Sequence, residues 1–195
     1  AIGDVYAENA LAALLGAVAA GVAPADAAEA LAIAPAPPGR FEVIHERPYV
    51  VVDYAHSPDA LARTVAIARS LADRGGARLT VVFGAGGKRD KAKRRPMGEA
   101  ARSADVVVLT TDNPRDEDPG EIAAEIAQGL VGHLAVRTVL DRRGAIEQAI
   151  LEAKDEDVVV VAGKGHEVEQ LVGSEIRRFS DVEVARAVLA SRART

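Results

Sequence analysis

The sequence predicts an α/β fold: a doubly wound, mostly parallel Rossmann-like sheet with helices on both faces, preceded by a short helical segment. Three observations lead to this prediction. Short valine-rich runs alternate with helical stretches between residues 41 and 189. The valine runs are continuous, which is typical of strands that are buried on both faces. A proline-rich stretch, APAPPGR at 34–40, separates this part from an alanine-rich beginning and indicates a linker.

The individual elements follow from the same patterns. Strands are expected in the runs FEVI, YVVVDY, LTVVF, DVVVLTT, VRTVL and DVVVVAG, with helices between them in SPDALARTVAIARSLADR, PMGEAARSA, PGEIAAEIAQGLV and DRRGAIEQAILEAK. The stretch EQLVGSEIRRFSD predicts a hairpin around Gly173, after which Ser180 or Asp181 caps a last helix. Two helices are expected within residues 9–32, split at Gly21, with Pro24 as the first residue of the second.

Composition excludes several classes of function. The 195 residues can bury one sizeable core, and with 3% aromatic residues it is built from Ala, Val and Leu. A net charge of −5 argues against nucleic acid as a partner, and the apolar runs are too short to span a membrane. Without cysteine there is no disulfide framework, which fits a cytoplasmic location. The scattered histidines predict no metal site, and no catalytic residue is assigned.

Polar residues gather where the predicted strands end. The stretches 53–56, 84–89, 112–115 and 163–167 each follow a valine-rich run. In open parallel sheets, ligands bind in the crevice at the carboxyl ends of the strands. We therefore expect these four loops to converge on one site.

The loop FGAGGKRDKAKRRPMG, residues 83–98, is the most unusual of these stretches. It has no Gly-Lys-Ser or Gly-Lys-Thr, and Arg89 stands where a dinucleotide fingerprint needs its third glycine. Its basic residues can form an anion site or simply a solvated charged face, and their place after a strand favours the anion site. Likewise DNPR can be a plain turn, but Arg115 adds a planar fork that suits a carboxylate.

Five motifs together resemble the C-terminal domain of the Mur ligases, within that family the branch that adds meso-diaminopimelate. In order, they are DYAHSPDAL (53–61), FGAGGKRDKAKR (83–94), TDNPRDEDP (111–119), AGKGHE (162–167) and FSDVEVARAVL (179–189). The resemblance covers residues 40–195. Residues 1–39 are similar to the end of the family's central ATPase domain, through NALAA at 9–13, followed by a linker.

The resemblance implies an ATP-dependent reaction that uses Mg²⁺ in peptidoglycan biosynthesis. ATP phosphorylates the D-glutamate side chain of UDP-N-acetylmuramoyl-L-alanyl-D-glutamate, and an amine of diaminopimelate attacks the acyl phosphate. These small molecules are the implied partners. Since the sequence has no Gly-Lys-Thr phosphate loop, we expect ATP and Mg²⁺ to be bound mainly by parts of the ligase absent here. This chain alone is then an inactive portion of the enzyme.

The resemblance also implies roles for individual residues in the matching motifs. Arg89 and Arg115 are expected to pair with carboxylates, and Glu167 with the distal ammonium. The full set implied for diaminopimelate is Arg89, Asp112, Asn113, Pro114, Arg115, Gly163 and Glu167. The residues implied to lie beside the nucleotide are Asn9, Arg40, Asp53 and His56. Lys88 departs from the family, which commonly has an acidic residue there.

Three alternatives stay open at this point. A Rossmann-type nucleotide-binding domain shares the expected sheet, but VVVDYAHSPDA lacks the glycine-rich turn that it needs. A non-catalytic binding module is the second alternative. The third, within the family, is a ligase that adds lysine.

Overall fold

A computed structural model describes residues 4–34 and 37–194, and the chain forms two compact units, Ala1–Pro37 and Pro38–Thr195. The first unit contains helices α1 (Asp4–Ala19) and α2 (Pro24–Ile33), separated at Gly21, whose φ is 95°. The predicted pair of helices and the role of Pro24 are confirmed, although α1 begins before residue 9. The origin of this unit in an ATPase domain stays a prediction.

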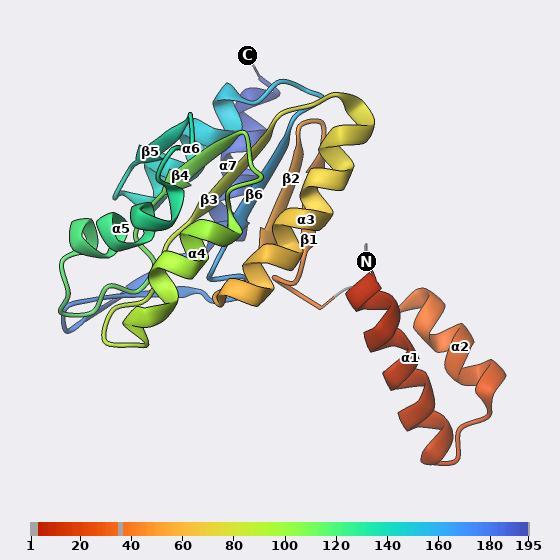
Figure 1. Cartoon of the computed structure of the whole chain (residues 1–195). Coiled ribbons are helices and arrows are strands. Elements are labelled where there is room, and N and C mark those ends of the chain that lie inside the picture. Colours follow the sequence, from red (N-terminus) through yellow and green to blue (C-terminus); the bar gives the residue numbers. More distant parts are fainter. Residues whose placement is uncertain (1–3, 35–36, 195) are drawn as a thin grey trace. The chain divides into compact units, whose positions relative to one another are not determined.

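The second unit is built on a sheet of order β1-β2-β6-β3-β4-β5, in which only β1 is antiparallel to its neighbour. The predicted doubly wound, mostly parallel sheet is confirmed (Figure 1). Its strands are β1 (Glu42–Glu46), β2 (Tyr49–Asp53), β3 (Leu79–Phe83), β4 (Val106–Leu109), β5 (Val136–Thr138) and β6 (Val158–Ala162).

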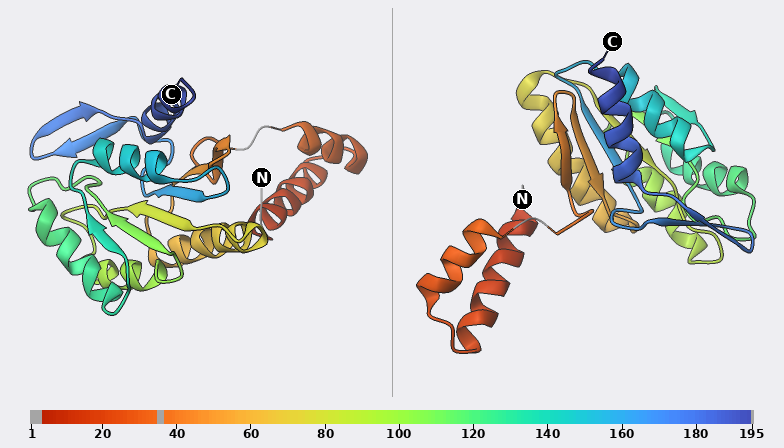
Figure 2. Two further views of the ribbon diagram at one scale, coloured as in Figure 1. Left: turned by 90° about the horizontal axis from the view of Figure 1, so that it is seen from above. Right: turned by 180° about the vertical axis from the view of Figure 1, so that it is seen from behind.

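Helices cover both faces of this sheet (Figure 2). One face carries α3 (Pro58–Gly75), α4 (Arg94–Ala100) and α5 (Pro119–Ala127), and the other carries α6 (Arg142–Glu152) and α7 (Asp181–Arg192). The central strands β3 and β6 are buried along their whole length, which explains why both are mostly apolar and do not alternate with charged residues. Two short 3₁₀ turns, Lys91–Lys93 and Gln128–Leu130, flank α4 and α5. No helix among the described residues is long and apolar enough to cross a membrane.

Local signals set the helix ends. The side chains of Ser57, Asp118, Asp141 and Ser180 each accept a hydrogen bond from a backbone N–H of the helix that follows. Ser180, and not Asp181, is therefore the cap of α7. Helix α4 begins at Arg94, before the expected Pro96, so part of the basic stretch is helical.

A hairpin of β7 (Glu169–Val172) and β8 (Glu175–Arg178) turns at Gly173 as predicted, and forms a sheet of its own. It follows β6, which lies between β2 and β3 although it comes last in the main sheet. After β3 the chain continues into α4 on one face of the sheet, whereas after β6 it continues through the hairpin into α7 on the opposite face. The ends of the neighbouring strands β3 and β6 therefore mark the switch point at which doubly wound sheets bind ligands.

Candidate functional site

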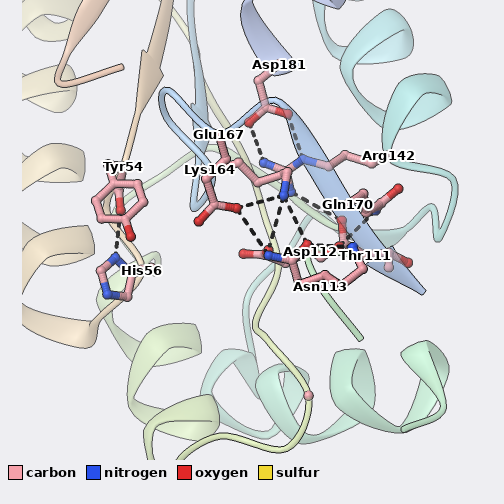
Figure 3. Close-up of polar contacts among 12 residues, drawn as sticks. Tyr54, His56, Thr111, Asp112, Asn113, Arg142, Lys164, Glu167, Gln170 and Asp181 are labelled. Carbon is pink, nitrogen blue, oxygen red and sulfur yellow. Dashed lines mark hydrogen bonds and ion pairs between the residues drawn. The ribbon is translucent and has the colours of Figure 1, made fainter. Parts of the chain in front are cut away.

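A cleft of about 350 Å³ lies at the carboxyl ends of β2, β3, β4 and β6. The four predicted loops therefore converge. The cleft is lined by Tyr54, His56, Gly86, Arg89, Asp90, Lys93, Asp112, Asn113, Arg115, Gly163 and Glu167. Figure 3 shows the polar contacts at its floor.

The glycines after β3 let two loops touch. The Gly87 N–H donates to the carbonyl of Asn113 at 2.9 Å, and a Cβ on Gly87 would lie 1.9 Å from the Pro114 oxygen. Nη1 of Arg115 in turn donates to the Gly87 carbonyl at 2.8 Å. The glycines thus let this loop pack against the backbone of the buried Pro114 and support the Arg115 side chain. These contacts explain the glycines without a phosphate ligand.

The basic stretch divides into paired and unpaired cations. Lys88 pairs with Asp116, Lys91 with Glu117, Arg94 with Glu117 and Glu125, and Arg95 with Glu99. Arg89 lines the cleft, and its guanidinium makes no hydrogen bond or ion pair to any residue in 4–34 or 37–194. Of the basic residues in this stretch, Arg89 and Lys93 line the cleft, so the prediction of an anion site now concerns these two residues.

Lys93 is the second cation of this wall. Its Nζ donates to the backbone carbonyl of His56 at 2.8 Å, which joins the loops after β2 and β3. Burial lowers the pKa of Lys93, against the opposing influence of Asp112 and Asp90. The sequence reading did not single Lys93 out from the other basic residues, because nothing in the local pattern tells which of them faces inward.

Glu167 and Asn113 meet over a buried cation, Lys164 (Figure 3). Nζ of Lys164, whose side chain is 0% exposed, donates to Oε2 of Glu167 at 2.9 Å and to Oδ1 of Asn113 at 3.1 Å. Nδ2 of Asn113 donates to the same Oε2 at 3.1 Å. Lys164 has no place among the predicted site residues. The only signal for it is the position of a lysine in GKGHE after a buried strand.

The hairpin β7–β8 holds Arg115, another support that sequence reasoning did not identify. The Arg115 N–H donates to the Leu171 carbonyl at 3.1 Å, and the Arg115 carbonyl accepts from Gly173 at 2.7 Å. The Leu171 N–H donates to Oδ1 of Asn113 at 3.0 Å, and Gln170 to the Asp112 carbonyl at 2.8 Å. These bonds stabilise Arg115 at a φ of 54°, which a side-chain-bearing residue seldom adopts.

Beneath the loops lies a fully buried ion pair, Arg142 with Asp181 (Figure 3). Nε and Nη2 of Arg142 donate to the two carboxylate oxygens at 2.7 and 2.6 Å. The same guanidinium donates to the carbonyls of Ala162 at 3.0 Å and Thr111 at 3.3 Å. Arg142 thereby ties the ends of β6 and β4 to the beginning of α7.

The residues expected beside the nucleotide lie in different places. His56 lines the cleft, with Nδ1 3.0 Å from the Tyr54 carbonyl. Arg40 lies over the Tyr54 ring, 5.1 Å from its centroid. Asp53 is buried, and its carboxylate accepts from the N–H groups of Phe41 and Ala55 and from the Thr64 hydroxyl. Asn9 is exposed on the first unit.

Gly39, at the start of the second unit, packs against the loop after β6. A Cβ built on Gly39 would lie 2.1 Å from the backbone nitrogen of His166 and 2.8 Å from Cα of Gly165. Its φ of 64° is one that glycine adopts readily. The chain entering the second unit therefore contacts the backbone of the GKGHE loop.

Charges of both signs face this cleft. Arg89, Lys93 and Arg115 present cations, while Glu167 and Asp112 present carboxylates. Such a cleft suits a small molecule that carries carboxylate and ammonium groups together. Among the described residues, no three His, Asp or Glu side chains are grouped as a metal site requires.

Comparison with known proteins identifies the family. The model of the Mur ligase, glutamate ligase domain matches residues 39–165, most of the second unit. The chain belongs to this family. The motif-based resemblance is thus confirmed, and the open alternative of a Rossmann-type nucleotide-binding domain is not supported.

Several relatives align along nearly the whole chain. UDP-N-acetylmuramoyl-L-alanyl-D-glutamate–2,6-diaminopimelate ligase of Acidovorax is 45% identical over 98% of this chain, and that of Solibacter usitatus is 46% identical over 96%. The chain spans 39% and 38% of their lengths. Since both are named as diaminopimelate ligases, the lysine-adding alternative is not borne out.

Solved structures agree. A ligase of the same name matches with a TM-score of 0.76 and 38% identity, covering 100% of this chain and 40% of that one. UDP-N-acetylmuramate–alanine ligase of Thermotoga maritima matches with a TM-score of 0.68 at 21% identity, covering 100% of this chain and 39% of that one. The second match shows the shared fold alone.

Proposed function

We propose that this chain is the amino-acid-binding domain of an ATP-dependent ligase that adds meso-diaminopimelate to UDP-N-acetylmuramoyl-L-alanyl-D-glutamate in peptidoglycan synthesis. The observation that carries the proposal is the cleft itself, in which Arg89, Arg115 and Glu167 meet from three strand ends. Diaminopimelate has two carboxylates and two ammonium groups, so it needs this combination. The names of the relatives support the same substrate.

Each residue then has a distinct task. Arg89 and Arg115 bind carboxylates, Arg115 through the planar fork that favours a bidentate pair. Glu167 binds the distal ammonium. Asn113 donates its remaining side-chain N–H, since its oxygen already accepts two bonds. Gly163 offers its carbonyl, because its N–H donates to the Asp53 carbonyl at 3.0 Å.

In the proposed reaction, this chain binds and orients the amine. The D-glutamate side-chain carboxylate takes the γ-phosphoryl group of ATP, the amine attacks the acyl phosphate carbon, and phosphate leaves. Among the described residues no three His, Asp or Glu side chains are grouped as a metal site requires, and the sequence has no Gly-Lys-Ser or Gly-Lys-Thr phosphate loop. We therefore assign ATP and Mg²⁺ mainly to other parts of the ligase, and we expect no ATP turnover by this chain alone.

Direct binding tests the proposal. In an NMR titration of this chain, meso-diaminopimelate should shift signals of Arg89, Asn113, Arg115 and Glu167, whereas L-lysine should leave Arg115 nearly unmoved because it lacks the second carboxylate. Arg89→Ala should weaken binding. The matched control is Arg95→Ala, which removes an exposed arginine of the same stretch that pairs with Glu99. Equal responses to both amino acids contradict the proposed substrate.

A further inference from the structure

Lys164 is a buried charge to which the proposed function gives no task. Its ammonium lies 2.9 Å from Glu167, 3.1 Å from Asn113 and 3.9 Å from Oδ1 of Asp112. A fully buried ammonium is costly unless it is paired and hydrogen-bonded. All three partners line the cleft, so the cation lies directly behind its wall (Figure 3).

The ammonium determines how the amide of Asn113 is turned. An ammonium group can only donate, so it selects the amide oxygen as its partner. The same oxygen accepts from the Leu171 N–H, and the amide nitrogen is thereby directed at Glu167. Without Lys164, the Leu171 N–H and the Glu167 carboxylate still distinguish the two ends of the amide, but the charged donor to its oxygen is lost.

The ammonium also determines which oxygen of Glu167 is available. Both bonds from Lys164 and Asn113 go to Oε2, and Oε1 makes no hydrogen bond within 4–34 and 37–194. Lys164 further offsets one of the two carboxylates, Asp112 and Glu167, that surround it. Removing it leaves two negative charges around one buried point, where they repel each other.

We propose that Lys164 is the positioning residue of this cleft. Its ammonium holds Oδ1 of Asn113 and Oε2 of Glu167, so that the free N–H of the one and Oε1 of the other face the ligand. The identity of that ligand rests on the proposed function, but the geometry does not. The inference can therefore be tested without any ligand.

Hydrogen exchange in the Lys164→Met variant is the first test. Exchange of the Leu171 N–H and of the Asn113 side-chain NH₂ should become about tenfold faster, the effect of losing roughly one hydrogen bond's net stabilisation. Core amides such as Val107 and Val160 should keep their protection. Unchanged exchange at Leu171 and Asn113, or an equal loss throughout the core, overturns the proposal.

Chemical rescue separates the charge from the packing. The chain has no cysteine, so Lys164→Cys creates a single thiol that can be alkylated in denaturant before refolding. Aminoethylation restores an ammonium at the length of lysine, whereas carboxamidomethylation adds a neutral group of similar size. Only the aminoethylated protein should regain slow exchange at Leu171 and Asn113. Equal recovery by both adducts shows that the ammonium is not what positions these groups.

A second variant covers the case in which Lys164→Met does not fold. Lys164→Met with Glu167→Gln removes both charges, and Glu167→Gln alone is its reference, because Lys164 still reaches Asn113 there. Faster exchange at Leu171 in the double variant supports the proposal, and identical exchange rejects it. A titration with meso-diaminopimelate is a separate arm. If the unmodified chain does not bind it, the proposed function fails while the exchange data still decide the role of Lys164.

Discussion

Two groups of arginines in this molecule have opposite surroundings. The frame arginines, Arg94 and Arg142, are buried and bound to carboxylates behind the cleft. The cleft arginines, Arg89 and Arg115, line the cleft and have no carboxylate partner among the described residues. Arg89 and Arg94 belong to the same basic stretch, yet they fall into different groups. Burial and pairing, and not the local sequence, therefore decide which cations are free to bind a ligand.

The comparison also separates stability from binding. A buried ion pair gains little overall, but breaking it leaves an uncompensated charge in the interior. An unpaired cation in a cleft contributes little to folding and is available for an incoming carboxylate. Substitutions in the two groups should therefore change different measurements.

The largest effect is expected for Arg142→Met. It leaves Asp181 buried without its partner, so the free energy of unfolding should fall by about 3–5 kcal/mol. Urea denaturation measures this. As a control, Arg142→Met with Asp181→Leu should recover most of the loss, because no unpaired charge remains. If the single variant is as stable as the original chain, the ion pair of Arg142 does not stabilise the fold and the proposed difference between the two groups is wrong.

Arg115→Ala should mainly affect selectivity. In a polypeptide that joins this chain to the ATP-binding part of a ligase, use of meso-diaminopimelate should weaken by roughly 2–5 kcal/mol, the range for truncating one partner of a buried charge pair. That is a factor of about thirty to several thousand. Lysine use should change far less. Steady-state kinetics with both amino acids checks this, and an equal loss for both makes Arg115 structural.

Arg89→Ala tests the same comparison with a cleft arginine. Because its guanidinium has no partner in the described structure, the free energy of unfolding should stay within about 0.5 kcal/mol of the original value. Binding of meso-diaminopimelate should nevertheless weaken. Urea denaturation measures the first effect and a binding titration measures the second. A clear loss of stability would show that Arg89 stabilises the fold as the frame arginines do.

The smallest effect concerns Glu117, which pairs with the frame residue Arg94. Hydrogen bonds from the Lys88 N–H and from Lys91, together with Arg94, lower the pKa of Glu117 to about 2 from its ordinary 4.5. Its folded-state pKa lies below its unfolded one, so its stabilising contribution is complete above about pH 4.5 and is lost as the pH falls toward 2.

The matched variant for this pH dependence is Glu117→Gln. The difference in urea midpoint between the two proteins should be constant above pH 4.5 and should shrink between pH 4.5 and pH 2. A difference that does not change over this range shows that Glu117 is not held in its ionised form by these partners.

Much of the fold could be predicted from the sequence because its signals are local. The apolar run LTVVF marked β3 and the valine run VVVVA marked β6, and the stretches that begin at Ser57 and Pro119 contain the helices α3 and α5. The order of the strands has no such signal, since β6 enters between β2 and β3 through contacts made far along the chain. The antiparallel β1 likewise follows from its turn into β2 and not from its own residues.

The candidate site, too, was predictable in part. The loops with unusual composition were predicted to converge, and the cleft contains residues from each of them. The support of those loops was not predicted. Lys164 contacts Asn113 across 51 residues, and Leu171 contacts it across 58, so only the folded chain shows these partners. Arg142 resembled any other charged residue at the start of a helix.

The close approach of Gly39 to the GKGHE loop has a consequence for protein engineering. Residues of a proline-rich linker are usually treated as spacer that can be exchanged freely. Here the last residue before Arg40 fits against the backbone at Gly165 and His166, with no room for a side chain. A designer who transplants this domain onto another partner should therefore place the junction upstream of Pro38, because a substituted residue at 39 would push directly on the loop that carries Lys164 and Glu167.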